Sequence, residues 1–155
     1  MIALLASWES QWIEEHRRML RTLGQHLDGW SNAIREDKVR KLYASQKKLG
    51  YLWFYAYMSA RGGGNKKVCH RLKIQDLRYI REKEFFNHPC DAQGPANVSY
   101  EARLIFKVVD IEDITPNIDV ETFVTVDETR VTKGSMLLNV LVVHDIGSHE
   151  ISRTR

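Results

Sequence analysis

The chain has 155 residues, of which 43% are hydrophobic and 28% are charged, and its formal net charge is +3. A chain of this length buries roughly 70% of the surface that its unfolded form exposes, so its core needs no disulfide or structural metal. Two cysteines are typical of a reducing compartment, and the apolar run 1–6 is too short for a membrane span and lacks the flanks of a signal peptide. We therefore expect one cytoplasmic domain over residues 1–147, a polar, frayed tail over 148–155, and no contact with a membrane.

Charge is distributed unevenly along the chain. Residues 61–83 carry eight Lys or Arg and two acids, a balance of +6, whereas residues 101–128 carry eight acids and two Lys or Arg, a balance of −6. A polyanion such as a nucleic acid would approach the basic region. Alternatively, the basic and acidic regions pair with each other across a sheet. The sequence leaves these two interpretations equally open.

The first third of the chain predicts one strand and two helices. Residues 1–6 form an apolar run that is typical of a short buried strand. Apolar residues then recur at intervals of three and four, which predicts an amphipathic helix that ends near Gly29. A second helix is expected from Ser31 or Asn32 to Gly50, a favourable residue for a helix C-terminus.

The central stretch predicts a hairpin. In residues 51–58 aromatic side chains at odd positions alternate with mainly apolar side chains at even positions, so both faces of this strand are expected to be buried. A glycine-rich basic tip, Arg61 to Lys67, follows, and residues 68–75 alternate again. The chain is therefore expected to place a flexible basic tip between two neighbouring strands.

The last third predicts further strands with long connections. Residues 85–97 contain two prolines and a glycine and are expected to form an irregular surface loop, and residues 111–118 an acidic turn region interrupted by Pro116. Strands are expected over residues 100–109, 122–126 and 136–144. Two helices followed by several strands predict an α+β fold, in which a curled, mainly antiparallel sheet forms a half-closed barrel covered by the helices.

Four residues could in principle hold zinc. They are Cys69, His70, His88 and Cys90. Zinc sites usually contain paired ligands two to four residues apart, but Cys69 and His70 are adjacent, and a strand would point them to opposite faces. We therefore favour a half-buried strand cysteine and a loop Cys-His pair, and predict no metal ion or cofactor.

No set of residues predicts catalysis. Asp28 followed by Glu36, Asp37 and Lys38 matches a magnesium-dependent nuclease formally, but the last three begin a predicted helix, where acids are favoured by the helix dipole. No serine or cysteine nucleophile motif is present, and the run 62–64 of glycines lacks the Lys-Ser or Lys-Thr of a phosphate-binding loop. The sequence therefore predicts a binding protein and not an enzyme.

Aromatic residues indicate where a ligand would bind. Tyr51 and Trp53 lie within the central strand and are expected to pack in the core. Other aromatic and hydroxyl residues lie where buried elements end and are expected to open into a common pocket: Trp8, Trp30, Tyr57 and Ser59. Aromatic walls with a few polar groups are what an unpaired base requires, and stacking contributes about 1–3 kcal/mol per base.

The order of elements and the character of two strands resemble a known superfamily. The strands are Leu52–Tyr57 (LWFYAY) and Ala102–Asp110 (ARLIFKVVD), with the basic segment 68–74 between them. Together with a short first strand that runs into Trp8, they resemble the PUA-like superfamily, including its EVE, ASCH and YTH branches. Within it, the chain is similar to the N-terminal target-recognition domains of McrB-type modification-dependent restriction systems.

This resemblance implies a pseudobarrel that binds nucleic acid and holds one extruded, modified base in an aromatic cage. At the positions that match, it implies a base pocket that includes Ser7, Trp8, Tyr57 and Ser59. It implies contacts to the nucleic-acid backbone from Arg61, Lys66, Lys67, Arg71 and Lys73. DNA with a modified base is the favoured partner, within a larger restriction assembly; the alternatives are an RNA-binding module and a protein-interaction module that uses the basic hairpin. The glycine tip and the loop 85–97 have no counterpart in the family.

Overall fold

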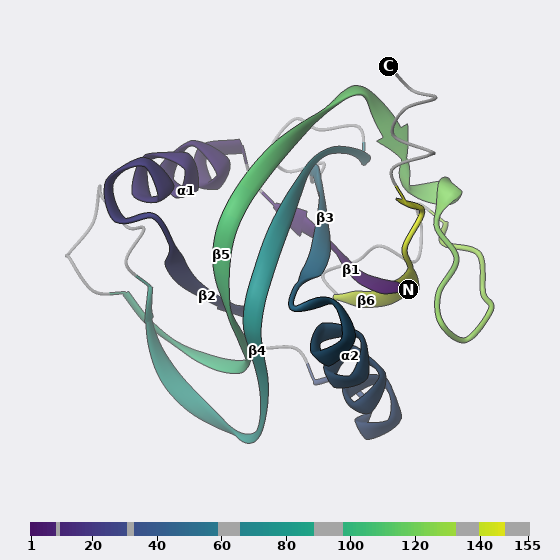
Figure 1. Cartoon of the computed structure of the whole chain (residues 1–155), viewed down its shortest axis with the longest axis horizontal. Helices are drawn as coiled ribbons and strands as arrows, with labels where there is room; N and C mark the ends of the chain where they lie inside the picture. Colours follow the sequence, from purple (N-terminus) through teal and green to yellow (C-terminus); the bar gives the residue numbers. More distant parts are fainter. Residues whose placement is uncertain (9, 31–32, 59–65, 89–97, 133–139, 148–155) are drawn as a thin grey trace.

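The computed structural model describes six segments of the chain, and Figure 1 shows their arrangement. The segments are residues 1–8, 10–30, 33–58, 66–88, 98–132 and 140–147. For residues 10–12, 26, 81–88 and 98–102 the description is limited to the backbone. Ser59, Arg61, the glycine tip 62–64 and the tail 148–155 therefore lie outside the described residues.

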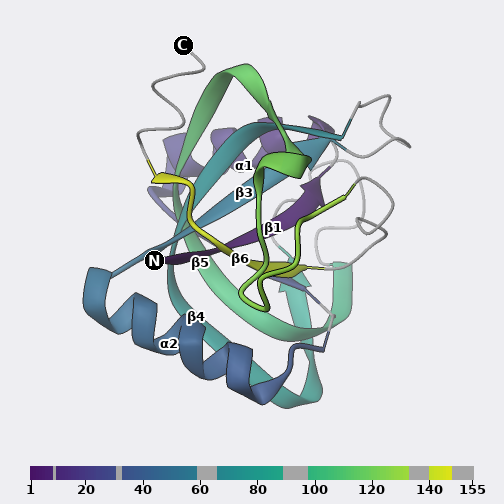
Figure 2. The same ribbon diagram turned by 90° about the vertical axis from the view of Figure 1, so that its right-hand side faces the viewer.

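Six strands form one mixed sheet in the order β2-β5-β4-β3-β1-β6. Their bounds are Ile2–Trp8 (β1), His26–Trp30 (β2), Leu52–Met58 (β3), Lys67–His88 (β4), Val98–Asp119 (β5) and Leu141–His144 (β6). β1 and β3 are parallel, and the other four neighbouring pairs are antiparallel. Within the described residues β2 and β6 end the sheet without pairing to each other, so the sheet is curled but open (Figures 1 and 2). The predicted α+β class, with a mainly antiparallel sheet and two helices, is confirmed.

Two helices of 14 residues each accompany the sheet: α1 (Ser10–Leu23) contacts β2 and β5, and α2 (Glu36–Leu49) contacts β1, β3 and β4. α2 buries Val39 and Leu42 against the sheet. It ends at Gly50 as predicted, where φ is 80°, the left-handed conformation that favours glycine. Neither of the described helices has the length and apolar character needed to cross a bilayer.

The first helix is shorter than predicted, and a strand follows it. Gly24, with φ of 77°, ends α1, and residues 26–30 form β2 instead of completing the helix. Leu27 lies four residues after Leu23 and so continues the helical spacing in the sequence. In the structure Leu27 is 42% exposed whereas the adjacent Asp28 is 4% exposed, which is the alternation of a strand. The second helix also begins later than predicted, at Glu36.

β4 and β5 are both longer than predicted. β4 continues to His88, so residues 85–88 are strand and not loop, while residues 89–97 lie outside the described segments. β5 extends to Asp119, so the predicted turn region 111–118 is also strand. Pro116 is tolerated because β5 shifts its register with β4 in this region, and a bulge needs no ladder hydrogen bond from the proline nitrogen.

A second irregularity, in β4, is supported by α2. Asp76 has φ of 53° where the register of β4 and β5 shifts. The N–H of Leu77 donates to Oε1 of Gln46 at 2.8 Å, and the N–H of Tyr79 donates to the hydroxyl of Tyr43 at 2.7 Å. Side chains of α2 therefore accept hydrogen bonds from the N–H groups of the bulged backbone. Without these acceptors the N–H groups would be unpaired, which costs free energy.

The last two predicted strands are partly replaced by other structure. Val120–Thr122 form a short 3₁₀ turn, and Val124 and Thr125 make isolated bridges instead of a strand. β6 covers only the end of the predicted strand 136–144, and it is an edge strand and not a central one. Residues 133–139 lie outside the description.

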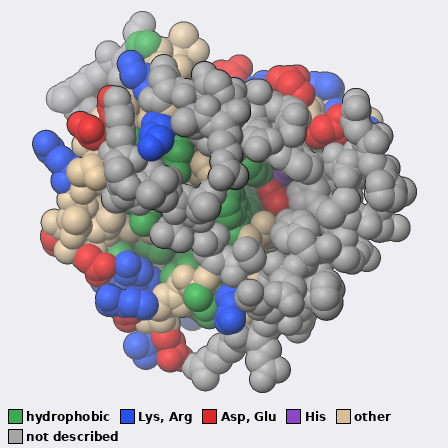
Figure 3. All heavy atoms as spheres, turned by 180° about the vertical axis from the view of Figure 1, so that it is seen from behind, with side chains coloured by type: hydrophobic (Ala, Val, Ile, Leu, Met, Phe, Trp, Pro, Cys, Tyr) green, Lys and Arg blue, Asp and Glu red, His purple; other side chains and the backbone are tan. Residues whose placement is uncertain are grey.

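The back of the molecule shows how the described surface side chains are distributed (Figure 3). Hydrophobic side chains lie at the centre of this face, and Lys and Arg side chains mix with Asp and Glu around them. Cations and acids therefore share this face, as they would if many of them pair within the protein.

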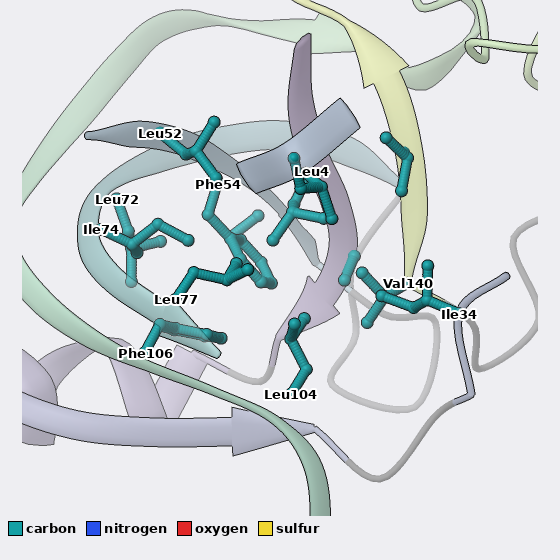
Figure 4. Close-up of a cluster of buried hydrophobic side chains, with 14 of the residues drawn as sticks. Leu4, Ile34, Leu52, Phe54, Leu72, Ile74, Leu77, Leu104, Phe106 and Val140 are labelled. Carbon is teal, nitrogen blue, oxygen red and sulfur yellow. The ribbon is translucent and has the colours of Figure 1, made fainter. Parts of the chain in front are cut away.

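β3 separates two cores, as its two apolar faces predict. The helix-side core includes Leu4, Trp8, Ile13, Leu42, Phe54, Leu72, Ile74, Leu104 and Phe106. The C-terminal core includes Leu5, Tyr55, Tyr57, Val68, Ile114, Val120, Phe123 and Val143. Figure 4 shows side chains of the helix-side core converging within the curve of the sheet, with Phe54 near their centre.

Candidate aromatic site under helix α1

Two tryptophans flank Phe54 in the helix-side core. Trp8 ends β1 and Trp30 ends β2, and their ring centroids lie 5.7 Å and 6.1 Å from that of Phe54, with interplanar angles of 26° and 27°. Phe54 is fully buried, Trp8 is 9% exposed, and Trp30 is partly buried. The pairing of β1 with β3, and the docking of β2 on β5, bring these rings together from separate parts of the chain.

A buried histidine and a buried aspartate lie beside these rings. His16 of α1 is fully buried, and its Nε2 lies 3.7 Å from Oδ2 of Asp28 in β2. The His16 ring also packs edge-on against Trp8, with centroids 4.3 Å apart. Oδ1 of Asp28 accepts a hydrogen bond from the N–H of Gly29 at 2.7 Å. Because burying an isolated carboxylate is costly, the neighbouring imidazole and backbone N–H stabilise this arrangement.

The indole nitrogen of Trp30 is buried and has no hydrogen-bond partner among the described residues. A buried N–H donor without an acceptor costs about 1–3 kcal/mol. A planar ligand that packs on the indole ring and offers an acceptor to Nε1 would remove this cost. The site is therefore chemically suited to an aromatic ligand with a polar edge.

The predicted pocket residues do not all share one pocket. Ser7 lies opposite Tyr57 in the pairing of β1 with β3, and their side chains are hydrogen-bonded on the side of the C-terminal core. Burial of Tyr57, which is 1% exposed, raises its pKa. Trp8 and Trp30 lie on the helix side instead, because successive residues of a strand point to opposite faces of a sheet.

Two of the predicted phosphate-binding cations contact the protein itself. The guanidinium carbon of Arg71 lies 3.7 Å from the ring centroid of Trp53, its Nε donates to Oε2 of Glu112 at 2.7 Å, and its side chain is only 11% exposed. Nζ of Lys73 lies 4.4 Å from the ring centroid of Tyr51. These ion-pair and cation–π contacts stabilise the β3–β4–β5 sheet, so the geometry favours a structural role for Arg71 over a phosphate contact.

The basic and acidic regions face each other across β4 and β5, which favours the second interpretation of the charge pattern for this part of the chain. The residues that face or bind one another are Arg71 with Glu112, Lys73 with Asp110, Lys67 with Asp119, and Asp76 with Lys107 at 3.0 Å. Lys66 precedes β4, where its N–H donates to the carbonyl of Met58 at 3.2 Å. Lys66 and Lys67 are thus the last residues of the hairpin tip and lie at the end of β3.

Among the described residues, no group of three or more potential metal ligands comes together. Of the four possible zinc ligands, the description includes the side chains of Cys69 and His70, and burial raises the pKa of the Cys69 thiol. His70 pairs with Asp113 at 2.9 Å. The side chain of His88 and the whole of Cys90 lie outside the description.

The acids of the formal nuclease match are separated. Asp28 lies in the strand under α1, whereas Glu36 and Asp37 lie in the first turn of α2. Asp37 pairs with Arg35 at 2.8 Å, and this guanidinium lowers the pKa of Asp37 to about 2. Nζ of Lys38, also in α2, pairs with Oδ2 of Asp127 at 2.8 Å, and Asp127 lies outside α2. A magnesium site shared by these residues is not formed.

Sequence reasoning missed His16 and the environment of Asp28. The spacing of the first helix includes His16 among its core-facing positions, and a helix that ends near Gly29 would place Asp28 in its last turn. The available signal was an ionisable side chain at a core-facing position of an amphipathic helix, since such a group needs a partner when it is buried. The partner is supplied by β2, whose pairing with β5 is not visible in the local pattern.

Comparison of the chain with protein-family models, with curated proteins and with solved structures finds no match. Similarity therefore assigns no family.

Proposed function

We propose that the protein is a nucleic-acid-binding domain of the PUA-like kind, which holds one unpaired base at the aromatic site under α1. The observation that carries the proposal is the buried Nε1–H of Trp30, which has no acceptor among the described residues although it lies beside the Phe54 stack. A nucleobase offers a flat face that can stack on the indole and ring or carbonyl acceptors for its N–H.

The chemistry of the site supports a base more than a purely apolar ligand. Stacking of a base on the indole of Trp30 contributes about 1–3 kcal/mol. The buried pair His16 and Asp28 places polar groups next to Trp8, within an otherwise apolar core. Polar groups held in fixed positions among apolar side chains discriminate between bases, because a base that does not match them leaves their hydrogen bonds to the ligand unmade.

The hairpin tip supplies the proposed contacts to the nucleic-acid backbone. The tip, residues 61–67, carries Arg61, Lys66 and Lys67 in the sequence. Arg71 and Lys73 have a different proposed role, since their contacts to Trp53 and Tyr51 brace the strands that carry the tip. Phosphate contacts at the tip would position the ligand, and the aromatic site would select the base.

The resemblance in element order favours DNA with a modified, extruded base, read as part of a modification-dependent restriction assembly. RNA is the alternative nucleic acid, because the aromatic site would accept an unpaired base of either polymer. A protein-interaction module that uses the basic tip is the alternative of a different class.

The test is fluorescence anisotropy with single- and double-stranded DNA and RNA, each with and without methylated bases. Trp30→Ala should weaken binding of the preferred ligand about 5- to 150-fold, the equivalent of one lost stacking contact. Trp53→Ala is the matched control, because Trp53 is also partly buried but packs against the C-terminal core under Arg71. It should retain the base preference in its folded fraction.

Backbone contacts are tested separately by the salt dependence of binding. Lys66→Ala should reduce the log–log slope by about 0.7–0.9, whereas Lys107→Ala, whose ammonium is paired with Asp76, should leave it unchanged. Lys67→Ala should reduce the slope only if nucleic acid displaces Asp119, which faces Lys67 across β4 and β5. Equal affinity of Trp30→Ala and the wild type for every ligand would overturn the aromatic site. Absence of binding to all the nucleic acids at low salt would overturn the proposed function and favour the protein-interaction module.

A further inference from the structure

Helix α1 is tied to the sheet by a second polar cluster that the proposed base site does not use. Nη2 of Arg17 donates to Oδ1 of Asp113 in β5 and lies 3.4 Å from Nδ1 of His70 in β4. The same His70 nitrogen lies 2.9 Å from Oδ1 of Asp113. One carboxylate oxygen therefore serves both the guanidinium and the imidazole, so the two groups compete for it.

This cluster is adjacent to the aromatic site through the helix itself. Arg17 directly follows His16, and the two side chains point to different strands: His16 contacts Asp28 of β2, and Arg17 contacts Asp113 of β5. The side chains of Arg17 and His70 are 26% and 19% exposed, whereas that of Asp113 is 59% exposed, so solvent screens the carboxylate but reaches its two partners only in part. Both contacts therefore link α1 to the sheet, in addition to its buried apolar residues Ile13 and Met19.

Charged groups from two elements act on His70: Glu14 and Arg17 of α1, and Asp113 of β5. Its neighbour in β4 is the thiol of Cys69, whose pKa is raised by burial. Burial lowers the pKa of His70, Asp113 raises it, and Arg17 lowers it again, with a net shift below the ordinary value of 6.5. The folded cluster therefore disfavours the imidazolium form, in which His70 and Arg17 would be two cations on one carboxylate oxygen. In addition, Nε of Arg17 is buried without a partner among the described residues.

We propose that Arg17, Asp113 and His70 form a clasp that holds α1 over the aromatic site, and that protonation of His70 displaces Arg17 from Asp113 and loosens the helix. A protonated imidazole donates a charge-assisted hydrogen bond to Oδ1 of Asp113 and repels the guanidinium. The clasp deepens the proposed function, since it makes binding of a base at Trp8 and Trp30 sensitive to mildly acidic pH. It also stands without that function, as a pH-dependent docking of α1.

The experiment is a pH titration of the full chain, without nucleic acid, followed by heteronuclear NMR. The ring of His70, the backbone amides of α1 and the indole N–H groups of Trp8 and Trp30 should change with one common midpoint below 6.5. His70→Gln should abolish the transition in α1 and in the indoles. His144→Gln is the matched control, because His144 pairs with Glu128 in a different part of the molecule and its loss should leave that transition in place.

Two further variants test the assignment of charges even where His70→Gln is poorly folded. Arg17→Gln should raise the midpoint of His70, and Asp113→Asn should lower it, shifts that a merely structural role does not produce. A transition of the indoles that persists in His70→Gln, or a His70 midpoint that is the same in the wild type and Arg17→Gln, would overturn the clasp. If the NMR transition occurs but no DNA or RNA binds at any pH, the clasp stands and the proposed function fails.

Discussion

On the C-terminal side of the sheet, the polar side chains of the central hairpin are paired. The hydroxyl of Tyr55 donates to Oδ1 of Asp145 at 2.6 Å, and Arg71 binds Glu112 while it covers the ring of Trp53. On the helix side, the indole N–H of Trp30 is buried without an acceptor among the described residues.

This difference separates polar groups that hold the fold from polar groups that are available to a ligand. A satisfied buried network rigidifies the structure and specifies one arrangement, whereas an incompletely satisfied one keeps an unfavourable free energy that binding can relieve. The comparison predicts that substitutions on the C-terminal side reduce stability and leave recognition intact. Substitutions of polar atoms on the helix side should do the reverse.

The largest effect is expected for Phe54, which the aromatic site shares with the core. Phe54→Ala should lower the free energy of unfolding by about 3–5 kcal/mol, because it removes a fully buried ring that contacts Trp8, Trp30 and Phe106. Chemical denaturation measures this loss. Leu23→Ala is the control, since Leu23 is 64% exposed and should change stability by less than about 0.5 kcal/mol. Similar losses in both variants would show that Phe54 is not the centre of the core.

The next effect tests the paired side of the comparison. Arg71→Ala should lower the free energy of unfolding by about 1.5–3 kcal/mol, because it removes a charged hydrogen bond to Glu112 and the contact with Trp53. Arg71→Lys should restore only part of the loss, since an ammonium cannot bind Glu112 and cover the indole with the same planar group.

The salt dependence of nucleic-acid binding should be unchanged in the folded fraction of Arg71→Ala. A slope reduced by about 0.7–0.9, as for one lost phosphate contact, would instead return Arg71 to the binding surface. The salt dependence therefore decides whether Arg71 stabilises the sheet or contacts the phosphates of the nucleic acid.

Smaller changes in stability are expected when either of two buried hydrogen-bond donors is removed, the hydroxyl of Tyr55 or the indole N–H of Trp30. Tyr55→Phe removes a hydroxyl that has a partner, and should cost about 0.5–1.5 kcal/mol of stability. Replacement of Trp30 by benzothienylalanine removes an N–H that has no partner among the described residues, and should raise the free energy of unfolding by about 1–3 kcal/mol while it weakens base binding. Equal losses of stability in thermal denaturation would mean that Trp30 Nε1 is satisfied in solution, and the contrast between the two faces would disappear.

The parts of the fold that the sequence predicts are those with an uninterrupted local pattern. Alternation over residues 51–58 predicts a strand buried on both faces, and the structure places β3 between β4 and β1 with a core on each side. Gly50 marks the end of α2 because a left-handed C-terminal residue has a strong local preference. The order of two helices before a run of strands is sufficient for the α+β class.

The parts that were mispredicted depend on contacts distant in sequence. β2 contains Asp28 and Gly29, poor strand residues, and it exists because it pairs with β5. β4 and β5 appear broken in sequence at Asp76 and Pro116, because bulges interrupt the alternation without ending the strands.

The candidate site also depends on contacts between residues that are distant in sequence. Its tryptophans are visible in the sequence as aromatic residues at the ends of buried elements. Their meeting with His16 and Asp28 follows from the tertiary docking of α1 and β2 around Phe54. The predicted partners Ser7 and Tyr57 lie on the other face because successive side chains of a strand point to opposite faces, so Ser7 points away from the face of Trp8. The register of β1 with β3 places Tyr57 beside Ser7.

The smallest effect is the pH dependence of stability that His70 contributes. Its pKa is lowered on folding, mainly by burial, so the unfolded chain takes up a proton at higher pH than the folded one. The free energy of unfolding should therefore be unaffected above the ordinary value of 6.5 and should fall as the pH drops from there toward the folded pKa. Each unit of difference between the two pKa values corresponds to about 1.4 kcal/mol.

Denaturation of the wild type and His70→Gln at a series of pH values measures this contribution, and the variant should lose less stability over the mildly acidic range. Asp113→Asn should lose more, because the aspartate is the charge that opposes the effect of burial on His70. Asp37 and Asp127 do not interfere, since their lowered pKa values place their loss of stability below the ordinary carboxyl value of 3.8. Parallel pH curves for the wild type and His70→Gln would show that His70 titrates alike in both states, and the helix-side polar groups would then include no proton switch.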